Sequence, residues 1–401
     1  MKVNSIEEQF VFKVSTIVVF ALYFLILLGS LNATVSSFVV IGLIALFLVF
    51  GITNIGLIVY LFKGANLNKL QLTILFLILL LAVICVLSIL NNSYQLKDLI
   101  NTVQMVACLN MILYLNLIKL DYSDLRPINM LVIFFTMCQF FIFILEGAPQ
   151  LFSSIYNNSN LIGPYMFYTS FFLICGMKFS KYKILYFVML AISFILILAS
   201  DTRSILLSIV ATFLVYIFWK FIVKSRFVAM AFFLVLITTS IAFIYIYPLL
   251  PTFQFYLPLE NWVLAHTGKS IMSGRNELWI PLTEFISQKP LLGYGPGTLA
   301  QGLYLHNQSP HNLYLNILMQ IGYLGLILIL IIFLLIWLSM TRYKNHFLVR
   351  LSASFFVGII VHQSFETTLF QNQLSIGLLQ IFIIGVGFSM ATHMNQNEKH
   401  E

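Results

Sequence analysis

Charged side chains are scarce in this sequence. Asp, Glu, Lys and Arg make up only 8% of its 401 residues, hydrophobic residues make up 61%, and the mean hydropathy is +0.99. Soluble globular domains carry about 25% charged residues, so this composition excludes that class. The segment from Val14 to Phe62 contains no charge, and at about 20 residues per crossing it is long enough for two membrane helices rather than a cleavable signal. The composition therefore predicts a polytopic membrane protein.

The sequence also lacks the common residue patterns of cofactor sites. Its four cysteines lie inside apolar runs without a CxxC pair, so we interpret them as small buried side chains. There is no HExxH motif, no Cys/His cluster and no P-loop, and the segment GYGPG does not have the GxGxxG spacing of a dinucleotide site. The basic residues are scattered between apolar runs instead of forming one basic face. We therefore predict no metal ion, no organic cofactor and no nucleic-acid partner.

About twelve apolar runs are long enough to cross a membrane. They fall roughly at residues 14–31, 36–62, 70–90, 98–118, 127–146, 161–179, 183–200, 204–223, 227–247, 311–338, 347–365 and 373–393. The fourth run is the weakest, because Asn101, Gln104 and Asn110 interrupt it. This pattern predicts an all-α protein that forms a single integral membrane domain over residues 1–401.

Basic residues are distributed unevenly between the two sides of the predicted bundle. With both termini in the cytoplasm, all of the 21 Lys and Arg residues fall on the inner side except five, which are Lys97, Arg203, Lys269, Arg275 and Lys289. Membrane proteins keep an excess of Lys and Arg in their short cytoplasmic loops. We therefore expect both termini on the cytoplasmic side.

The segment SDTRS, residues 200–204, places Asp201 and Arg203 at the start of the run at 204–223. A cation at a helix N-terminus opposes the helix dipole, so the helix itself does not explain Arg203. A bound anion would satisfy both the arginine and the free amides of the first turn. The alternative is a local salt bridge between Arg203 and Asp201 that pins the turn.

Residues 248–310 form a long outward loop of about 60 residues, far longer than an ordinary connection. Its aromatic residues and balanced charges predict an ordered segment. Within it, SGRNELWIPLTEFI has apolar residues at helical spacing, which predicts a short amphipathic helix at the membrane interface with Ser273 as N-cap and Arg275 in the first turn. The alternative for Arg275 is a side chain that reaches to lipid headgroups. We expect GYGPG to make a tight turn that lets the backbone approach a ligand or a neighbouring helix.

Further polar residues follow this loop. His311 and Asn312 stand at the start of the run at 311–338, and Tyr314 lies on its first turn. A neutral imidazole can accept or donate a proton, which suits His311 to acid–base chemistry. His306 is the competing candidate, and helix capping is the alternative role for either histidine.

Two more polar clusters face the same side. NNSNLIGPY, which contains Asn160, opens the run at 161–179, and HQSFE ends the run at 347–365 with Glu366. An ionisable residue close to hydrocarbon is costly, so Glu366 is a functional candidate. Its structural alternative is an ion pair with Arg203 or Arg275.

The residues predicted on the outer side include arginines, amides, a histidine and carboxylates. This set is suited to bind a lipid-linked phosphate or pyrophosphate. Arginine binds phosphate oxygens in a fork geometry and stays charged at physiological pH. Arg203 and Arg275 can therefore offset the charge that develops on a pyrophosphate leaving group, in place of a metal ion.

The order of three motifs resembles a known family. SGRxxLW, PLLGYGPG and HNxYL…QxGxxG resemble the long-loop signature of the O-antigen ligase and O-antigen polymerase superfamily, and SDTRS and NSNLIG look like two further motifs upstream. The resemblance covers most of residues 155–330. One departure is Ser204, which stands where the family often has a glycine after the arginine.

The resemblance implies a GT-C-like membrane fold and metal-independent glycan transfer from an undecaprenyl-pyrophosphate donor in the cytoplasmic membrane of a bacterium. It implies that Arg203 and Arg275 bind the pyrophosphate, and that His311 activates the acceptor or holds the donor. The remaining residues expected on the substrate side are Asn160, Ser273, Gly274, Asn312, Tyr314 and Glu366. A flippase and a chain-length regulator are the expected protein partners.

The function predicted in this way is a polysaccharide polymerase that joins lipid-linked repeat units on the outer face of the membrane. A ligase that delivers glycan from the same donor to another acceptor is the nearest alternative. A lipid-linked oligosaccharide flippase would show paired repeats and charges around a midplane cavity, whereas the polar groups here gather in one outward loop. A scaffold protein of the assembly machinery would leave the arginines and the histidine unexplained.

Overall fold

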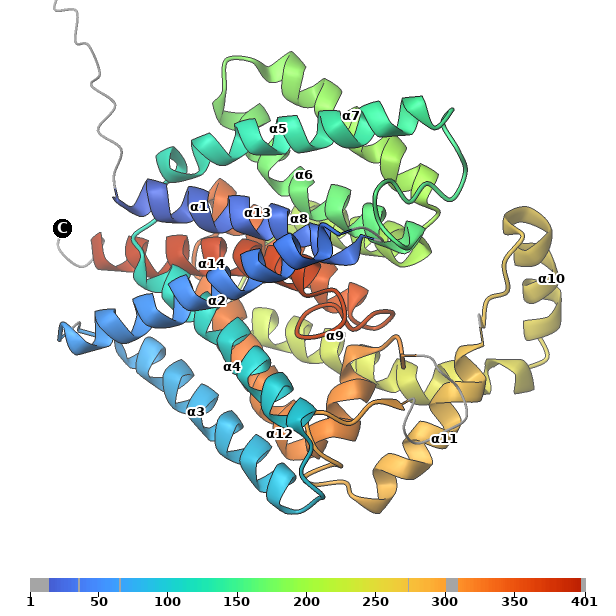
Figure 1. The fold of residues 1–401 in the computed structure, drawn as a ribbon. Helices are drawn as coiled ribbons and strands as arrows, with labels where there is room; N and C mark the ends of the chain where they lie inside the picture. The colour runs from blue at the N-terminus through green and yellow to red at the C-terminus, as the bar shows by residue number, and fades with distance from the viewer. Residues whose placement is uncertain (1–13, 35–36, 65, 273, 301–308, 398–401) are drawn as a thin grey trace, which may run out of the picture.

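The computed structural model describes residues 14–34, 37–64, 66–272, 274–300 and 309–397, and within them the secondary structure is helical apart from one isolated bridge (Figure 1). The α-helices are α1 (Val14–Gly29), α2 (Val39–Phe62), α3 (Lys69–Leu90), α4 (Leu96–Leu117), α5 (Tyr122–Leu145), α6 (Ile162–Phe179), α7 (Lys183–Ser200), α8 (Arg203–Ile222), α9 (Arg226–Ile246), α10 (Tyr256–Thr267), α11 (Arg275–Gln288), α12 (Leu313–Met340), α13 (Phe347–His362) and α14 (Leu374–Asn397). Three short 3-10 helices are η1 (Ser30–Ala33), η2 (Ser159–Leu161) and η3 (Tyr247–Thr252).

A helix coincides with every predicted apolar run, so the all-α polytopic prediction is confirmed. In the described part of the chain, ten helices are long and apolar enough to cross a membrane. α6 and α13 are not among these ten. α13 has only 16 residues, and α6 is lined with aromatic and small polar side chains and is buried along most of its length. α6 is therefore covered mostly by protein, in agreement with its lower hydropathy.

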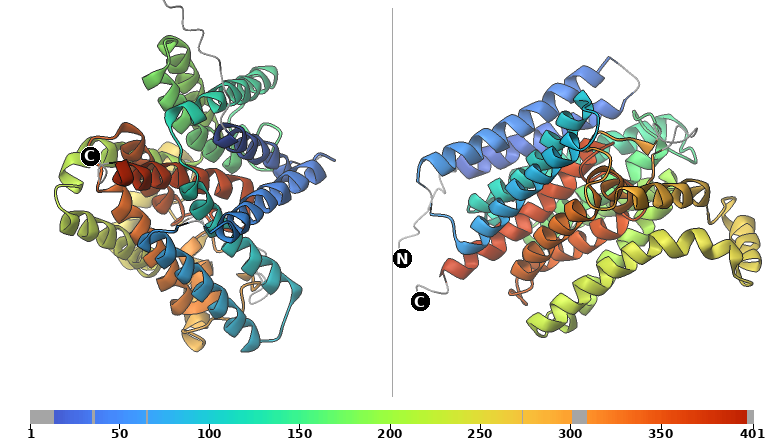
Figure 2. Two further views of the ribbon diagram at one scale, coloured as in Figure 1. Left: turned by 90° about the vertical axis from the view of Figure 1, so that its left-hand side faces the viewer. Right: turned by 90° about the horizontal axis from the view of Figure 1, so that it is seen from below.

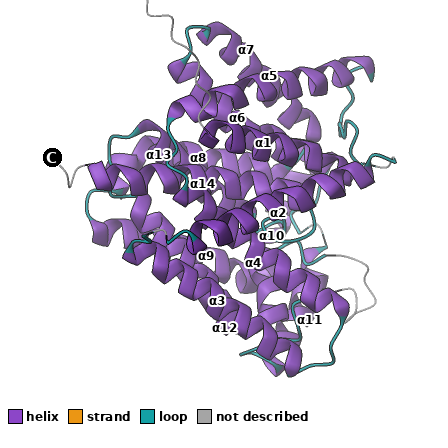
Figure 3. Cartoon of the chain, turned by 60° about the vertical axis from the view of Figure 1, so that its left-hand side comes forward, coloured by secondary structure: helices purple, strands orange, loops and turns teal. Residues whose placement is uncertain are grey.

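The long helices run alongside one another in one bundle (Figures 2 and 3). α14 lies in its interior and packs on α4, α13, α12, α6 and α1. α6 packs on α7, and α8 packs on α13. The C-terminal end of α14 and the α10–α11 segment lie at opposite ends of the bundle (Figure 2). The described part of the predicted outward loop, residues 248–310, therefore lies at one end of the helix bundle.

The polar residues that interrupt the fourth predicted run have partners inside the protein. Asn101 donates to the carbonyl of Pro296 (2.9 Å), and Gln104 donates to the carbonyl of Phe370 (2.6 Å). Asn110 donates to the side chain of an asparagine in α2 (2.9 Å). Because these bonds satisfy the amides away from lipid, α4 remains a full-length helix.

The long loop is ordered in its described residues, as predicted, but it contains a helix that we did not predict. None of the residues of α10 is buried, and the helix projects from the end of the bundle (Figure 1). Its link to the rest of the loop is Glu260, whose carboxylate accepts from the backbone N–H of Ile271 (2.9 Å) and whose pKa is lowered chiefly by that bond. A helix that buries no face needs no regular apolar stripe, so periodicity gave no signal for it.

The predicted amphipathic helix is present as α11. Its apolar residues Leu278, Trp279, Leu282 and Ile286 are buried. They pack against α12 and η3, so the apolar face of α11 is buried in the protein core and is not presented to lipid. The N-cap is a glycine, Gly274, with φ of 74°.

The segment GYGPG approaches a neighbouring helix. The backbone N–H of Gly297 donates to the carboxylate of Asp98 at the start of α4 (2.7 Å). Gly295 has φ of 109°, and a Cβ atom there would lie 2.7 Å from the same carboxylate. Its N–H donates to the carbonyl of Gln320 in α12 (3.0 Å). The turn was predicted to approach either a ligand or a neighbouring helix, and the structure shows that it contacts neighbouring helices.

Candidate functional site

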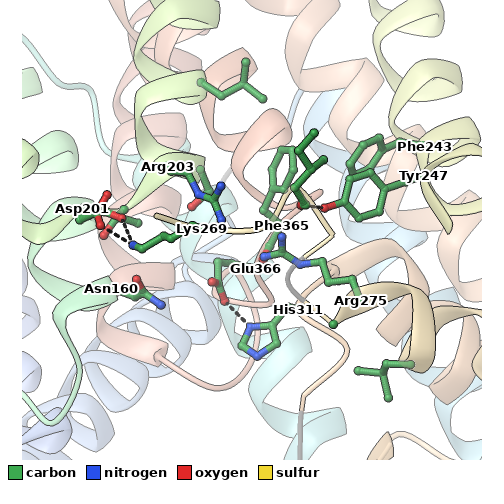
Figure 4. Close-up of a pocket in the computed structure, with 16 residues that line it drawn as sticks. Asn160, Asp201, Arg203, Phe243, Tyr247, Lys269, Arg275, His311, Phe365 and Glu366 are labelled. Carbon is green, nitrogen blue, oxygen red and sulfur yellow. Dashed lines mark hydrogen bonds and ion pairs between the residues drawn. The ribbon is translucent and has the colours of Figure 1, made fainter. Parts of the chain in front are cut away.

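A cavity of about 730 Å³ opens where α7 turns into α8, at the end of the bundle that carries the outward loop (Figure 4). The predicted site residues that line it are Asn160, Arg203, Gly274, Arg275, His311 and Glu366. Ser273 and His306 lie outside the described residues. The cavity therefore collects side chains from motifs that are more than 200 residues apart in the chain, from Asn160 to Glu366 (366 − 160 = 206).

Asn312 and Tyr314 do not line this cavity; both are buried in the protein. Asn312 is the N-cap of α12: its side chain accepts from the N–H of Leu315 (2.9 Å) and donates to the carbonyl of Ser364 (3.0 Å). The hydroxyl of Tyr314 donates to the carbonyl of Ile360 (2.8 Å). These bonds fix the start of α12 against the end of α13, and thereby place His311 beside the residues that follow α13.

The SDTRS turn holds Arg203 at the start of α8. Asp201 has φ of 53° and ends α7, which turns the chain sharply enough for Arg203 to begin the next helix. Arg203 donates to the carbonyl of Ser270 (3.1 Å). Asp201 forms its ion pair with Lys269, so the predicted alternative of an Asp201–Arg203 salt bridge is wrong.

The Asn-containing motif packs directly against this turn. A Cβ atom on Gly163 would lie 2.8 Å from the hydroxyl of Ser200 and 3.0 Å from that of Thr202, so only glycine allows this approach. Asn160, on η2 just before α6, is exposed and lines the cavity on the same side as Asp201 (Figure 4).

Arg275 is the first residue of α11 and approaches the cavity from the opposite side to Lys269 (Figure 4). Its guanidinium donates to the carbonyl of Phe365 (3.4 Å), and its carbon atom Cζ lies 5.6 Å from the centre of the Phe365 ring. This cation–π contact keeps the side chain inside the cavity rather than directed to lipid headgroups.

His311 and Glu366 form a pair at the base of the cavity. His311 Nδ1 lies 3.0 Å from Glu366 Oε2, and the two side chains are 41% and 20% exposed. Burial by itself raises the pKa of Glu366, but the hydrogen bond and the nearby charge of His311, and to a lesser extent His362 and Arg275, bring the pKa below its ordinary value of 4.5. An ionised carboxylate can only accept, so Nδ1–H of His311 is the donor in this pair, and Nε2 can take up a proton whenever the ring is neutral. The predicted alternative, in which Glu366 pairs with an arginine, gives way to pairing with histidine.

The backbone of His311 is unusual. Its φ is 46°, in the left-handed region that only a few side chains tolerate, and its N–H donates to the hydroxyl of Ser309 (3.3 Å). Capping of α12 is left to Asn312, so capping is not the role of His311. The left-handed turn directs the imidazole toward Glu366.

The cavity carries three cationic side chains and two carboxylates. Sequence reasoning missed Lys269 as a site residue, although a signal was present: it is one of the five basic residues on the predicted outward side, and three of those five line this cavity. Both carboxylates are engaged, Asp201 with Lys269 and Glu366 with His311. Among the described residues there is no group of three or more His, Cys, Asp or Glu side chains that could hold a metal ion. The arrangement is suited to bind an anion between arginines beside a proton acceptor.

Comparison with known proteins agrees with these features. Residues 188–330, which include Arg203, Lys269, Arg275 and His311, match the family model described as O-antigen ligase. The ComP-specific O-oligosaccharyltransferase of Acinetobacter baylyi (strain ATCC 33305 / BD413 / ADP1) is 30% identical over 274 residues, which is 62% of this chain and 46% of that protein. The chain thus matches less than half the length of this relative. The predicted resemblance to the O-antigen ligase superfamily is confirmed over this part of the chain.

Proposed function

We propose that the protein transfers a glycan from an undecaprenyl-pyrophosphate carrier to an acceptor hydroxyl, because its O-antigen ligase-type segment supplies Arg203, Arg275 and His311 to the cavity. The observation that supports this most is the meeting of Arg203, Arg275 and the His311–Glu366 pair in one cavity. Each comes from a different part of the chain, and none is needed to close a hydrophobic core. Their chemistry matches a pyrophosphate leaving group and a hydroxyl that must lose a proton.

The donor would place its pyrophosphate between the two arginines. Arg203 stands at the N-terminus of α8, where the free amides of the first turn also favour an anion. Arg275 approaches from the other side of the cavity, at the N-terminus of α11. Both cations hold their charge at any physiological pH, so the site needs no proton uptake to bind phosphate oxygens.

The reaction balances with the groups at hand. The oxygen of the acceptor hydroxyl forms a bond to the anomeric carbon of the donor sugar, and the bond from that carbon to the pyrophosphate oxygen breaks. The hydroxyl proton passes to Nε2 of His311, whose Nδ1–H is held by Glu366. The negative charge stays on the lipid pyrophosphate, where Arg203 and Arg275 stabilise it as it develops. No step in this scheme uses a metal ion or a nucleotide.

The acceptor defines two versions of this proposal. In the first, the acceptor is another lipid-linked repeat unit, and the product is a growing O-antigen, capsule or exopolysaccharide chain. In the second, the acceptor is a different molecule that receives finished glycan, which the match to O-antigen ligases and the likeness to the A. baylyi O-oligosaccharyltransferase favour. Both versions use the same donor site and the same proton acceptor.

The proposed setting is the cytoplasmic membrane of a bacterium, with both termini inside and the cavity facing outward. The distribution of Lys and Arg supports this orientation. A flippase would supply the lipid-linked donor on that side, and a chain-length regulator would act on the polymer. We expect the protein to need neither for a single transfer in a purified system.

The test is to incubate the purified protein in nanodiscs with its lipid-linked repeat unit, without metal or nucleotide, and to separate the products by size. A ladder of lengthening glycans would support the polymerase version. A single transfer that appears only when a second acceptor is added would support the ligase version.

The matched variants are Arg275→Ala, inside the cavity, and Lys289→Ala, which removes an equal charge from the same loop outside it. We expect transfer to be lost in the first and retained in the second. Equal transfer by both variants, or an intact donor under every acceptor condition, would contradict the proposal.

A further inference from the structure

A second cavity, of about 600 Å³, lies along the membrane-spanning part of the bundle between α6, α7, α8 and α13. Its floor is apolar and buried, with Phe167, Ile197 and Phe355 at 4%, 3% and 1% exposure. Its rims are exposed, with Phe194 of α7 at 48% and Phe213 of α8 at 61%. The cavity is therefore a groove that is open toward the surrounding lipid, and we call it the α7–α8 groove.

The groove exists because two consecutive helices separate after their connecting turn. α7 packs closely on α6, and α8 packs closely on α13, while α7 and α8 make at most marginal contact with each other. They meet at the SDTRS turn and diverge from there. α7 lies at the edge of the bundle, so nothing in the described protein covers the opening (Figures 1 and 3).

One end of the groove is positively charged. Lys178, in the last turn of α6, and Lys183, the first residue of α7, line it and are both exposed. No acidic side chain lines the groove. Within the described chain neither lysine forms an ion pair; Lys178 lies 5.9 Å from the centre of the Phe347 ring. The charged end thus offers two cations and no internal anion.

We propose that the α7–α8 groove is a binding site for a membrane phospholipid with an anionic headgroup. Its phosphate lies between Lys178 and Lys183, and an acyl chain lies along the apolar floor. From Lys183 to Ile197 the groove follows fourteen residues of α7 (197 − 183), about 21 Å at about 1.5 Å per residue. One leaflet of a hydrocarbon core of about 30 Å is about 15 Å deep, so a chain rooted at the lysines fits within the groove.

The position of the lysines argues against the glycan donor as the occupant. The proposed pyrophosphate site is at Arg203, at the start of α8, whereas Lys183 is at the far end of α7. A donor held by its pyrophosphate at Arg203 cannot place the same group on the lysines. The lysine end therefore requires a different anion, an argument that rests on the proposed donor site at Arg203.

The first test measures lipid retention. The purified full-length protein in detergent is titrated with phosphatidylglycerol or with phosphatidylcholine of the same acyl chains, and binding is followed by native mass spectrometry. We expect one phosphatidylglycerol to bind in preference to phosphatidylcholine. The double variant Lys178→Gln/Lys183→Gln should lower the affinity for phosphatidylglycerol by about 30-fold, because each basic residue at a membrane surface contributes about 1 kcal/mol. Its affinity for phosphatidylcholine should not change. Lys63→Gln/Lys119→Gln, which changes two exposed lysines outside the groove, is the matched control and should bind like the parent.

The second test blocks the floor instead of the charged end. Leu190→Trp places a large ring from the half-buried wall of α7 into the groove and should reduce binding of both lipids while the lysines remain. Equal affinity for the two headgroups, or equal loss in the control and the groove lysine variants, would overturn the proposal. So would displacement of phosphatidylglycerol by a polyprenyl phosphate at lower concentration, because the groove would then belong to the donor.

Discussion

At the scale of single residues, the role of Arg275 can be tested most directly by mutation. Its guanidinium lies over the Phe365 ring and donates to the Phe365 carbonyl, so its position is fixed before any ligand arrives. Loss of a preorganised donor of this kind costs about 10²–10³ in rate. We expect Arg275→Ala to lower kcat by about that factor without loss of membrane insertion. Arg275→Lys should also be impaired, because an ammonium cannot reproduce fork-like binding; a fully active lysine variant would rule out that part.

Glu366 predicts a dependence on pH. Its pKa is lower in the folded protein than its ordinary value of 4.5, so the carboxylate contributes stability that is present above pH 4.5 and is lost as the pH falls through the lowered value. Glu366→Gln should therefore melt below the parent at pH 7, and the gap should narrow as the pH drops below 4.5. Thermal unfolding in detergent measures this. Glu284→Gln, at an exposed position on α11, is the control, and a gap that stays constant with pH would contradict the assignment.

At the scale of elements, α11 connects the two halves of the site. The indole N–H of Trp279 donates to the carbonyl of Pro310, next to His311, at 2.8 Å, and the ring is fully buried against Phe243 and Tyr247. Trp279→Ala should cost about 3–5 kcal/mol of unfolding free energy. Trp279→Phe should cost less, about 1–3 kcal/mol, because it leaves the carbonyl without its donor.

A merely local role for Trp279 would not affect turnover. We expect kcat of Trp279→Phe to fall as well, because the helix that carries Arg275 is no longer tied to the segment that carries His311. The neighbouring Ile280→Ala, at a 43% exposed position on the same helix, should change neither quantity appreciably. Normal turnover in a destabilised Trp279→Phe protein would show that the tie is not needed for catalysis.

The elements also show what could be predicted from sequence. Long apolar runs were sufficient to predict the membrane helices, and helical spacing was sufficient to predict α11, because burial in lipid or protein imposes those patterns. α10 was missed because it buries nothing. Asn312 and Tyr314 were expected at the substrate, yet Asn312 caps the start of α12 and the Tyr314 hydroxyl donates to the carbonyl of Ile360 in α13. Sequence places a polar residue near a site, but whether it faces the cavity or the packing depends on rotation about a helix axis that only the fold defines.

At the scale of the whole molecule, the orientation can be tested directly. In a protein with Cys138, the only cysteine that is not buried, replaced by Ala, we expect Glu284→Cys to react with a membrane-impermeant maleimide on intact cells. Lys224→Cys, at the opposite end of the bundle, should react only after the membrane is opened. The reverse pattern would place both termini outside and the cavity on the cytoplasmic side, which would contradict the proposed orientation.

The left-handed backbone conformation of His311 limits which amino acids can replace this histidine. Asparagine, aspartate, histidine and glycine tolerate such a conformation best, so substitution at this position is confined to a short set of residues by shape before chemistry is considered. Only histidine in that set accepts a proton as a neutral ring near neutral pH. An asparagine here would keep the turn and remove the proposed base. We expect the same replacement to give a protein that binds the proposed lipid-linked donor without consuming it.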